Sequence, residues 1–325
     1  MKRRELLRLV AGGSAGALAQ SRFGLAQTPS RVYRIGIMAG NRQDEVPWPA
    51  FFDELSRLGL IEGKNLQIDG HFSMRDETAA DVAAGLTTHA VDAIVTGGYV
   101  RTRAAQTATR SIPILTVADD LVVMGLVNSL ARPGGNTTGI SILATELDGK
   151  RQELLLELIP SARSIGTLVD PNVTRPEQLK ALVQQAQARG VECLIYTVGK
   201  PEEIIPSIEA AHAAAVQGLN VLAASLFNAN QQIIIRQTAA LQLPAIYQWP
   251  EIAEAGGLAA YGPNYNQLYR QHARQLAKLL QGTKPADMPI EQPATFELVI
   301  NVKTAKALSL TIPIAVLARA DEVIE

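Results

Sequence analysis

Residues 129–142 read SLARPGGNTTGISI, a stretch rich in Gly, Pro, Asn and Thr that lies between long apolar runs. Before it, residues 33–118 alternate short β-rich runs with segments of helical spacing, a rhythm typical of a parallel sheet covered by helices. After it, residues 145–249 repeat this alternation. The stretch therefore divides the chain into two doubly wound α/β lobes, each with a parallel, Rossmann-like sheet.

Three roles compete for this stretch: a phosphate loop, a plain connector and a hinge between two lobes. The phosphate loop is excluded, because RPGGNTTG has neither the GxxxxGK[ST] spacing nor its lysine. We interpret residues 132–136 as the turn that leaves the first lobe and residues 137–142 as the strand that crosses to the second. Its glycines are expected to give the chain the backbone freedom that this change of lobe requires.

The C-terminal part has too few elements for a third core, so we expect it to complete the first sheet. The predicted lobe 1 is then 27–139 plus 260–325, and lobe 2 is 140–259. The two lobes would be joined by three crossover segments, near 137–143, near 256–262 and near 290–299. The predicted hinge residues are Thr138, Gly139, Gly257 and Leu258.

Residues 1–26 have the pattern of an export signal, with a basic start, a weakly apolar middle and small residues before two cleavage sites. The pair Arg3-Arg4 resembles a twin-arginine signal. Cleavage is expected after Ala19 or Ala26, and a surface helix or a retained membrane anchor are the alternatives. We expect a periplasmic protein without a membrane span in its mature chain.

Composition argues against several classes of protein. The formal net charge is −1 and aromatic residues make up 5%, so the chain lacks the basic stripe and stacking surface of a nucleic-acid-binding protein. Cys193 is the single cysteine, and the four histidines are scattered without the spacing of metal ligands. After the predicted export signal, neither GxSxG nor GxGxxG is present. We therefore expect no metal, no cofactor and no enzymatic activity.

Ligands of open parallel sheets bind beyond the carboxyl ends of the strands. In TGGY, residues 96–99, a strand leads into a helix, so backbone N–H groups there could bind a carboxylate. Asp119 and Asp120 are adjacent and point in opposite directions, so one is expected to cap a turn and the other to contact a ligand cation. The predicted ligand-binding residues are Gly40, Asn41, Gly98, Tyr99, Asp120, Asp170, Asn172, Ser225, Tyr247 and Trp249.

Several long motifs, among them SLARPGGNTTGIS, KRQELLLELIPSARSIGTL, EAGGLAAYGPN and the terminal LARADEVIE, resemble the ABC-transporter substrate-binding proteins of the tryptophan/tyrosine type. The resemblance implies a type I periplasmic-binding-protein fold, in which two lobes close on a hinge around a ligand in the cleft. It also implies an ABC permease as partner and passive binding in place of catalysis. We expect such a receptor to be a monomer. A periplasmic module that feeds a membrane signalling receptor is the alternative.

The cleft departs from the family pattern more than the scaffold does. Tyr99-Val100 stand where the family has Thr-Pro, while Asp120 keeps the family's acidic position. For a receptor of this kind, we expect Asp120 to contact an ammonium or hydroxyl group, Gly98 and the Tyr99 N–H to hold a carboxylate, and Tyr99 and Trp249 to stack on the ligand. An aromatic or apolar amino acid or carboxylate is the expected ligand.

Overall fold

The structure is a computed structural model that describes residues 31–325, apart from the side chains of residues 144 and 145. Val32–Glu325 forms one compact unit. The predicted export signal, residues 1–26, lies outside the described residues. Within the part that is described, no helix is both long enough and apolar enough to cross a bilayer.

The first sheet has five parallel strands in the order β2-β1-β3-β4-β5. Its central strands are apolar runs in which Ile35, Ile37 and Val95 are fully buried. Strands that are apolar on both faces need a covering of helices on both faces. The strands are β1 (Tyr33–Met38), β2 (Leu66–His71), β3 (Ala93–Gly97), β4 (Ile114–Ala118) and β5 (Thr137–Ser141).

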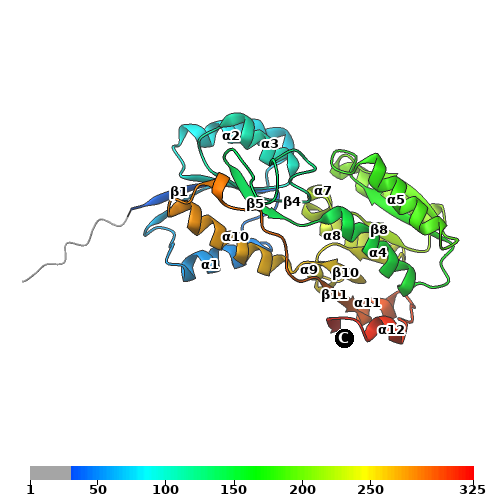
Figure 1. Cartoon of the computed structure of the whole chain (residues 1–325). Helices are drawn as coiled ribbons and strands as arrows, with labels where there is room; N and C mark the ends of the chain where they lie inside the picture. The colour runs from blue at the N-terminus through cyan, green and yellow to red at the C-terminus, as the bar shows by residue number, and fades with distance from the viewer. Residues whose placement is uncertain (1–30) are drawn as a thin grey trace, which may run out of the picture. The chain divides into compact units, whose positions relative to one another are not determined.

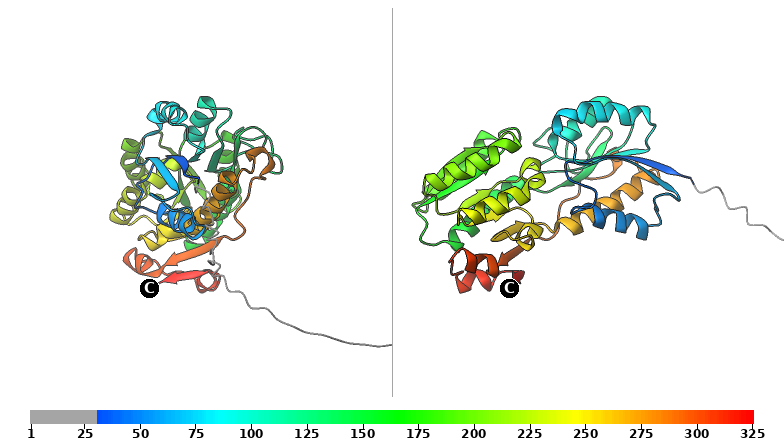
Figure 2. Two further views of the ribbon diagram at one scale, coloured as in Figure 1. Left: turned by 90° about the vertical axis from the view of Figure 1, so that its left-hand side faces the viewer. Right: turned by 180° about the vertical axis from the view of Figure 1, so that it is seen from behind.

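Two pairs of helices cover the two faces of this sheet (Figure 1). The pair α2 (Ala79–Thr88) and α3 (Tyr99–Ala108) covers one face, after the short 3-10 turn η1 (Asp76–Thr78). On the other face α1 (Trp48–Arg57) packs along α10 (Tyr265–Leu280), a pairing that Figure 2 also shows from behind. This sheet and these four helices are lobe 1.

Lobe 2 is built on a seven-stranded sheet in the order β12-β11-β10-β9-β8-β6-β7. All pairs in it are parallel except β10 with β11. The strands are β6 (Ser164–Val169), β7 (Glu192–Thr197), β8 (Leu219–Val221), β9 (Ala245–Tyr247), β10 (Ala259–Gly262), β11 (Glu297–Asn301) and β12 (Glu322–Ile324). The helices are α4 (Ala144–Leu158), α5 (Pro176–Gln187), η2 (Pro201–Glu203), α6 (Ile204–Ala213), α7 (Ser225–Ala229), α8 (Gln231–Ala240), α9 (Pro250–Glu254), α11 (Val302–Ala307) and α12 (Ile314–Leu317).

The prediction of two parallel α/β lobes is confirmed, but the assignment of 260–325 to lobe 1 is wrong for its strands. β10 pairs with β9, and β11 and β12 extend the sheet of lobe 2 from there. In this segment α10 joins lobe 1, where it packs on α1, and residues 285–291 lie along β5 of the same lobe. A short apolar strand fits the edge of either sheet, and the hydrogen bonds to β9 that decide the matter come from residues far away in the sequence.

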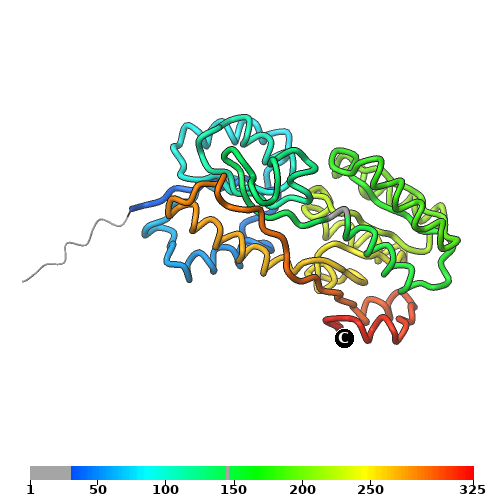
Figure 3. The backbone as a smooth tube through the Cα atoms, in the orientation of Figure 1, coloured from blue at the N-terminus to red at the C-terminus, as the bar shows by residue number. Residues whose placement is uncertain are grey.

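The chain passes between the two sheets three times, and the connections can be followed in Figure 3. It passes from β5 to α4, from β10 to α10, and finally from η3 (Pro285–Asp287) to β11. Thr138 and Gly139 lie inside β5, and Gly257 and Leu258 lie just before β10 in lobe 2. The four residues predicted as hinges therefore lie just ahead of two of the connections, and their hinge role stays a prediction.

Position 139 requires glycine for a reason other than the backbone freedom that the sequence predicts. It pairs with Thr116 of the neighbouring strand β4, and its φ is +149°. A Cβ built on Gly139 would lie 1.8 Å from the backbone oxygen of Thr116. The position needs glycine because two strands approach too closely there for any side chain.

Candidate functional site

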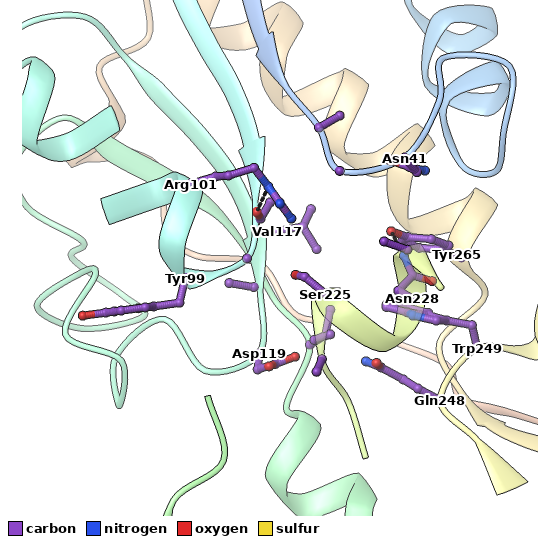
Figure 4. Close-up of a pocket in the computed structure, with 18 of the residues that line it drawn as sticks. Asn41, Tyr99, Arg101, Val117, Asp119, Ser225, Asn228, Gln248, Trp249 and Tyr265 are labelled. Carbon is purple, nitrogen blue, oxygen red and sulfur yellow. Dashed lines mark hydrogen bonds between the residues drawn. The ribbon is translucent and has the colours of Figure 1, made fainter. Parts of the chain in front are cut away.

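A cavity of about 80 Å³ lies between the two lobes. Its wall includes Ala39, Gly97 and Ala118 at the carboxyl ends of strands of lobe 1, and Ala224 and Gln248 beyond strand ends of lobe 2. Figure 4 shows side chains from both lobes directed toward this space. The cavity is where an open parallel sheet places a ligand, and here two such sheet edges face it.

The amino end of α3 opens on this cavity. Gly98 precedes the helix with φ +76°, a backbone conformation that favours glycine, and its carbonyl accepts hydrogen bonds from Thr102 N at 3.3 Å and Thr102 Oγ1 at 2.6 Å. The first N–H groups of a helix have no partner within the helix, and its dipole favours an anion there. Gly98 and Tyr99 both line the cavity, but the N–H of Gly98 donates to the carbonyl of Val117 at 2.9 Å. The carboxylate site therefore stays a prediction, and it falls to the N–H groups from Tyr99 onward.

Arg101 is a site residue that sequence reasoning missed. It lies in the first turn of α3, is only 8% exposed, and is the sole cation among the described residues that line the cavity. Its Nε donates to the carbonyl of Gly97 at 3.0 Å, and its Nη1 forms an ion pair with Asp76. Nothing in the sequence RTRAAQTATR distinguishes Arg101 from Arg103, because only the docking of the helix decides which one faces the cleft.

The aspartate that lines the cavity is Asp119, and Asp120 is not among the lining residues. Asp120 Oδ1 accepts from the N–H groups of Val122 and Val123 at 3.1 and 3.0 Å, so this side chain caps a turn. One aspartate does cap a turn, but it is Asp120, the one predicted to contact the ligand, and Asp119 lines the cavity in its place. Adjacent residues alternate in direction, and the sequence does not say which direction is inward.

The pKa of Asp119 is raised to about 7. Burial is the largest cause, because it disfavours the charged form, and the negative charge of Asp148 is the next. The charge of Arg151 opposes the shift. Asp148 and Arg151 form a buried ion pair in α4, so the two opposing charges near Asp119 belong to one pair. A carboxyl group of this kind is poised to take or release a proton near neutral pH.

Aromatic rings form a wall on one side of the cavity. Trp249 stacks on Tyr265 with ring centroids 4.1 Å apart, and Tyr265 meets Tyr269 edge to face at 5.1 Å. Tyr269 in turn meets Trp48 at 5.2 Å. Tyr265 and Tyr269 were not predicted as site residues, because α10 reads in the sequence as an ordinary amphipathic helix. The wall offers a ligand a rigid apolar surface.

Two predicted aromatic contacts are placed elsewhere. The Tyr99 ring points away from the cavity centre (Figure 4), and the guanidinium of Arg103 lies 5.6 Å from its centroid. Tyr247 is buried in lobe 2, its hydroxyl 3.0 Å from Thr238 Oγ1, and it is not among the lining residues. Of the three predicted aromatic contacts, only Trp249 forms part of the cavity wall with its ring.

The remaining predicted residues divide into two groups. Gly40, Asn41 and Ser225 line the cavity, and Asn41 is held by a hydrogen bond from Trp48 Nε1 at 2.9 Å. Asp170 and Asn172 do not line it, because Asp170 Oδ1 accepts from both the backbone and side-chain nitrogens of Asn172 in a local turn. Among residues 31–325, no group of three or more His, Cys, Asp or Glu side chains is arranged to hold a metal ion.

Gly98 faces Ser225 from the opposite lobe, and this contact gives a test of the lobe arrangement. A Cβ on Gly98 would lie 2.5 Å from Ser225 Oγ. Gly98→Ala is expected to weaken ligand binding about tenfold, because the lobes must separate and the left-handed backbone is strained. The double variant with Ser225→Ala should recover part of the affinity in isothermal titration calorimetry. Equal affinity of Gly98→Ala and the unmodified protein would contradict this arrangement.

Comparison with known proteins shows which family this chain is similar to. A curated relative, the tyrosine-binding protein of Clostridioides difficile (strain R20291), is 27% identical over 263 residues, which are 80% of this chain and 75% of the relative. The ABC domain of a Streptococcus pneumonia protein in complex with L-Trp matches with a TM-score of 0.80 at 23% identity, over 90% of this chain and 100% of that one.

A ligand-free, open structure of a Clostridium difficile substrate binding protein with adhesive properties matches less closely, with a TM-score of 0.63 at 25% identity, over 90% of this chain and 99% of that one. The family model described as ABC transporter substrate binding protein matches residues 49–324. The chain has the type I periplasmic-binding-protein fold and belongs to the ABC transporter substrate-binding proteins, a family of binding proteins and not of enzymes.

Proposed function

We propose that the protein is the exported receptor of an ABC importer and binds a small amino acid or carboxylate, with an aromatic or apolar body, by hinge closure. The observation that supports this most is the cavity between the lobes, in which a helix amino end and Arg101 from lobe 1 face an aromatic wall that includes Trp249 of lobe 2. The names of the relatives, which refer to tyrosine and to L-Trp, support an amino acid of this type.

Each end of an amino acid has a complementary group in the cavity. The carboxylate would accept hydrogen bonds from the first N–H groups of α3 and from the guanidinium of Arg101. The ammonium group would pair with the carboxylate of Asp119. The apolar body would lie against the rings of Trp249 and Tyr265, which stack on each other in this structure and have few rotatable bonds to immobilise on binding.

Closure of the lobes would follow from these contacts. Arg101 and Asp119 belong to lobe 1 and Trp249 to lobe 2, so a ligand that touches all three stabilises the closed state relative to the open one. The predicted export signal and the family both support delivery of the ligand to a membrane permease from outside the cytoplasm.

Binding is tested with the mature chain by thermal shift and then by isothermal titration calorimetry. The panel consists of the protein amino acids, simple aromatic acids and aliphatic acids, with uncharged sugars as the comparison group. A ligand at about 100 times its Kd should stabilise the protein by about 2.7 kcal/mol through mass action. The proposal would be contradicted if a sugar stabilised the protein and no acid or amino acid did.

The affinity for an amino acid should depend on pH through Asp119. With its pKa near 7, this carboxyl is protonated in the free protein below pH 7 and must lose the proton to pair with an ammonium group. Affinity should therefore rise with pH, by at most about tenfold per unit, and level off above about pH 7. Calorimetry across this range checks the profile.

Two controls accompany the pH profile. Asp119→Asn should flatten it, since the amide does not titrate in this range. The matched acid that lacks the amino group should gain no affinity as the pH rises. If the affinity of the Asp119→Asn variant still rose steeply with pH, the group that loses its proton would be another one.

A further inference from the structure

Two hydrogen-bond donors in the cavity wall have no partner among residues 31–325. They are Gln248 Nε2 and Trp249 Nε1, both buried, in residues that are 6% and 5% exposed. Both residues line the cavity directly after β9. Buried polar groups in native proteins are nearly always hydrogen-bonded, since an unsatisfied donor lowers stability. Two adjacent exceptions in the wall of a binding cavity point to partners that come from the ligand.

The Trp249 ring and the backbone at Gln248 are held in place by their surroundings. The Trp249 ring is stacked on Tyr265, and Pro250 follows it at the start of α9. The backbone oxygen of Gln248 is tightly packed, because a Cβ built on Gly262 would lie only 1.9 Å from it. The chain from which both side chains extend is therefore fixed in the cavity wall.

Their position separates them from the carboxylate site. Figure 4 shows Gln248 and Trp249 on the lobe 2 side of the cavity, with Arg101 entering from the lobe 1 side. The Gln248 amide is directed toward Asp119 across the space between them. An amide can present either its oxygen or its NH₂ group, but the indole N–H only donates. A group that satisfies both side chains is therefore a hydrogen-bond acceptor.

We propose that the solute presents a second oxygen to Gln248 and Trp249, at the end remote from the carboxylate that Arg101 binds. The substrate class is then carboxylates, with or without an amino group, that have a remote hydroxyl, carbonyl or second carboxylate. This inference rests on the proposed function and narrows it. Acids with a purely hydrocarbon body would leave both donors unsatisfied on closure, and sites built to hydrogen-bond a ligand discriminate strongly against such analogues.

The test uses matched pairs of ligands that differ only in the remote oxygen. The pairs are phenylalanine and tyrosine, benzoate and 4-hydroxybenzoate, and hexanoate and adipate, each titrated calorimetrically into the full mature chain. In at least one pair the oxygenated member should bind about tenfold or more tightly than its partner. Equal affinities within every pair that binds would overturn the inference and leave the proposed function standing.

Two variants assign the preference to the two donors. Gln248→Leu removes the amide, and Trp249→Phe removes the indole N–H while it keeps a ring to stack on Tyr265. Each should reduce the preference within the responsive pair by about tenfold, and the readout is the ratio of the two affinities, because a general loss of binding would lower both members alike. An unchanged preference in both variants would overturn the inference.

Controls separate the possible failures. Gln187→Leu makes the same replacement at an exposed position of α5, outside the cavity, and should keep the preference of the unmodified protein. Thermal unfolding of each free variant shows whether it is folded before the titration. If none of the six acids binds the folded, unmodified protein while an uncharged solute does, the proposed function and this inference both fail.

Discussion

Gly139→Ala is expected to destabilise the protein by about 3 kcal/mol or more and to leave little folded material. The new Cβ would lie 1.8 Å from the Thr116 backbone oxygen, well inside van der Waals contact. That oxygen belongs to β4, which pairs with β3 on one side and β5 on the other, so it cannot move aside without the loss of strand pairing. The φ of +149° adds strain for any residue with a side chain.

Urea unfolding of the purified variant, or its soluble yield if purification fails, measures the effect. Gly149→Ala is the matched control, because this glycine lies inside α4 with ordinary φ and the nearest atoms to a Cβ are 3.7 Å away, at the end of the Gln185 side chain. Alanine there should be neutral or stabilise by up to about 1 kcal/mol. Equal unfolding midpoints for both variants would show that β4 and β5 are not packed as described.

Arg101→Met is expected to weaken the binding of a carboxylate ligand about 100-fold, which corresponds to about 2.7 kcal/mol. The variant keeps a side chain of similar length but removes the sole cation among the described lining residues. A carboxylate that enters the closed cavity would then lose a charge-assisted hydrogen bond and be poorly solvated. Calorimetric titration with the best acid found for the unmodified protein measures the loss.

The fold should survive this change. Asp76, the ion-pair partner, has a side chain that is 43% exposed, so its charge stays hydrated after the arginine is removed. We expect a stability loss of about 1 kcal/mol, close to that of a partly exposed ion pair. Arg103→Met is the control on the same helix, since Arg103 binds the carbonyl of Gly125 outside the cavity. A 100-fold loss in this control, or none in Arg101→Met, would remove Arg101 from the carboxylate site.

The fold class could be predicted from the sequence because it depends on local patterns. Apolar runs such as residues 93–97 and 164–169 form strands by their composition, and the helical segments between them require parallel pairing. The order of the last strands could not be predicted in this way. β10, β11 and β12 are short, and the sheet that they join depends on contacts with β9 and not on their own residues.

The site was predicted in part, and the misses share a physical cause. The helix amino end at Gly98 follows from a turn and a helix that are adjacent in the chain, and the structure places it in the cavity wall. Asp119, Arg101 and Tyr99 depend instead on which way a side chain points once its element is docked. The sequence shows that an acid, a cation and an aromatic ring are present near strand ends, without their directions.

Local sequence thus determined the two-lobe α/β class, the position of the cleft at the strand ends and the glycine at the start of α3. Tertiary packing decided that Arg101, and not Arg103, faces the cleft, that Asp119 lines it while Asp120 caps a turn, and that α10 contributes Tyr265 and Tyr269 to its wall. The reason is that hydrophobic periodicity specifies which face of an element is buried. The neighbours that each buried side chain contacts are determined only when segments distant in the sequence pack together.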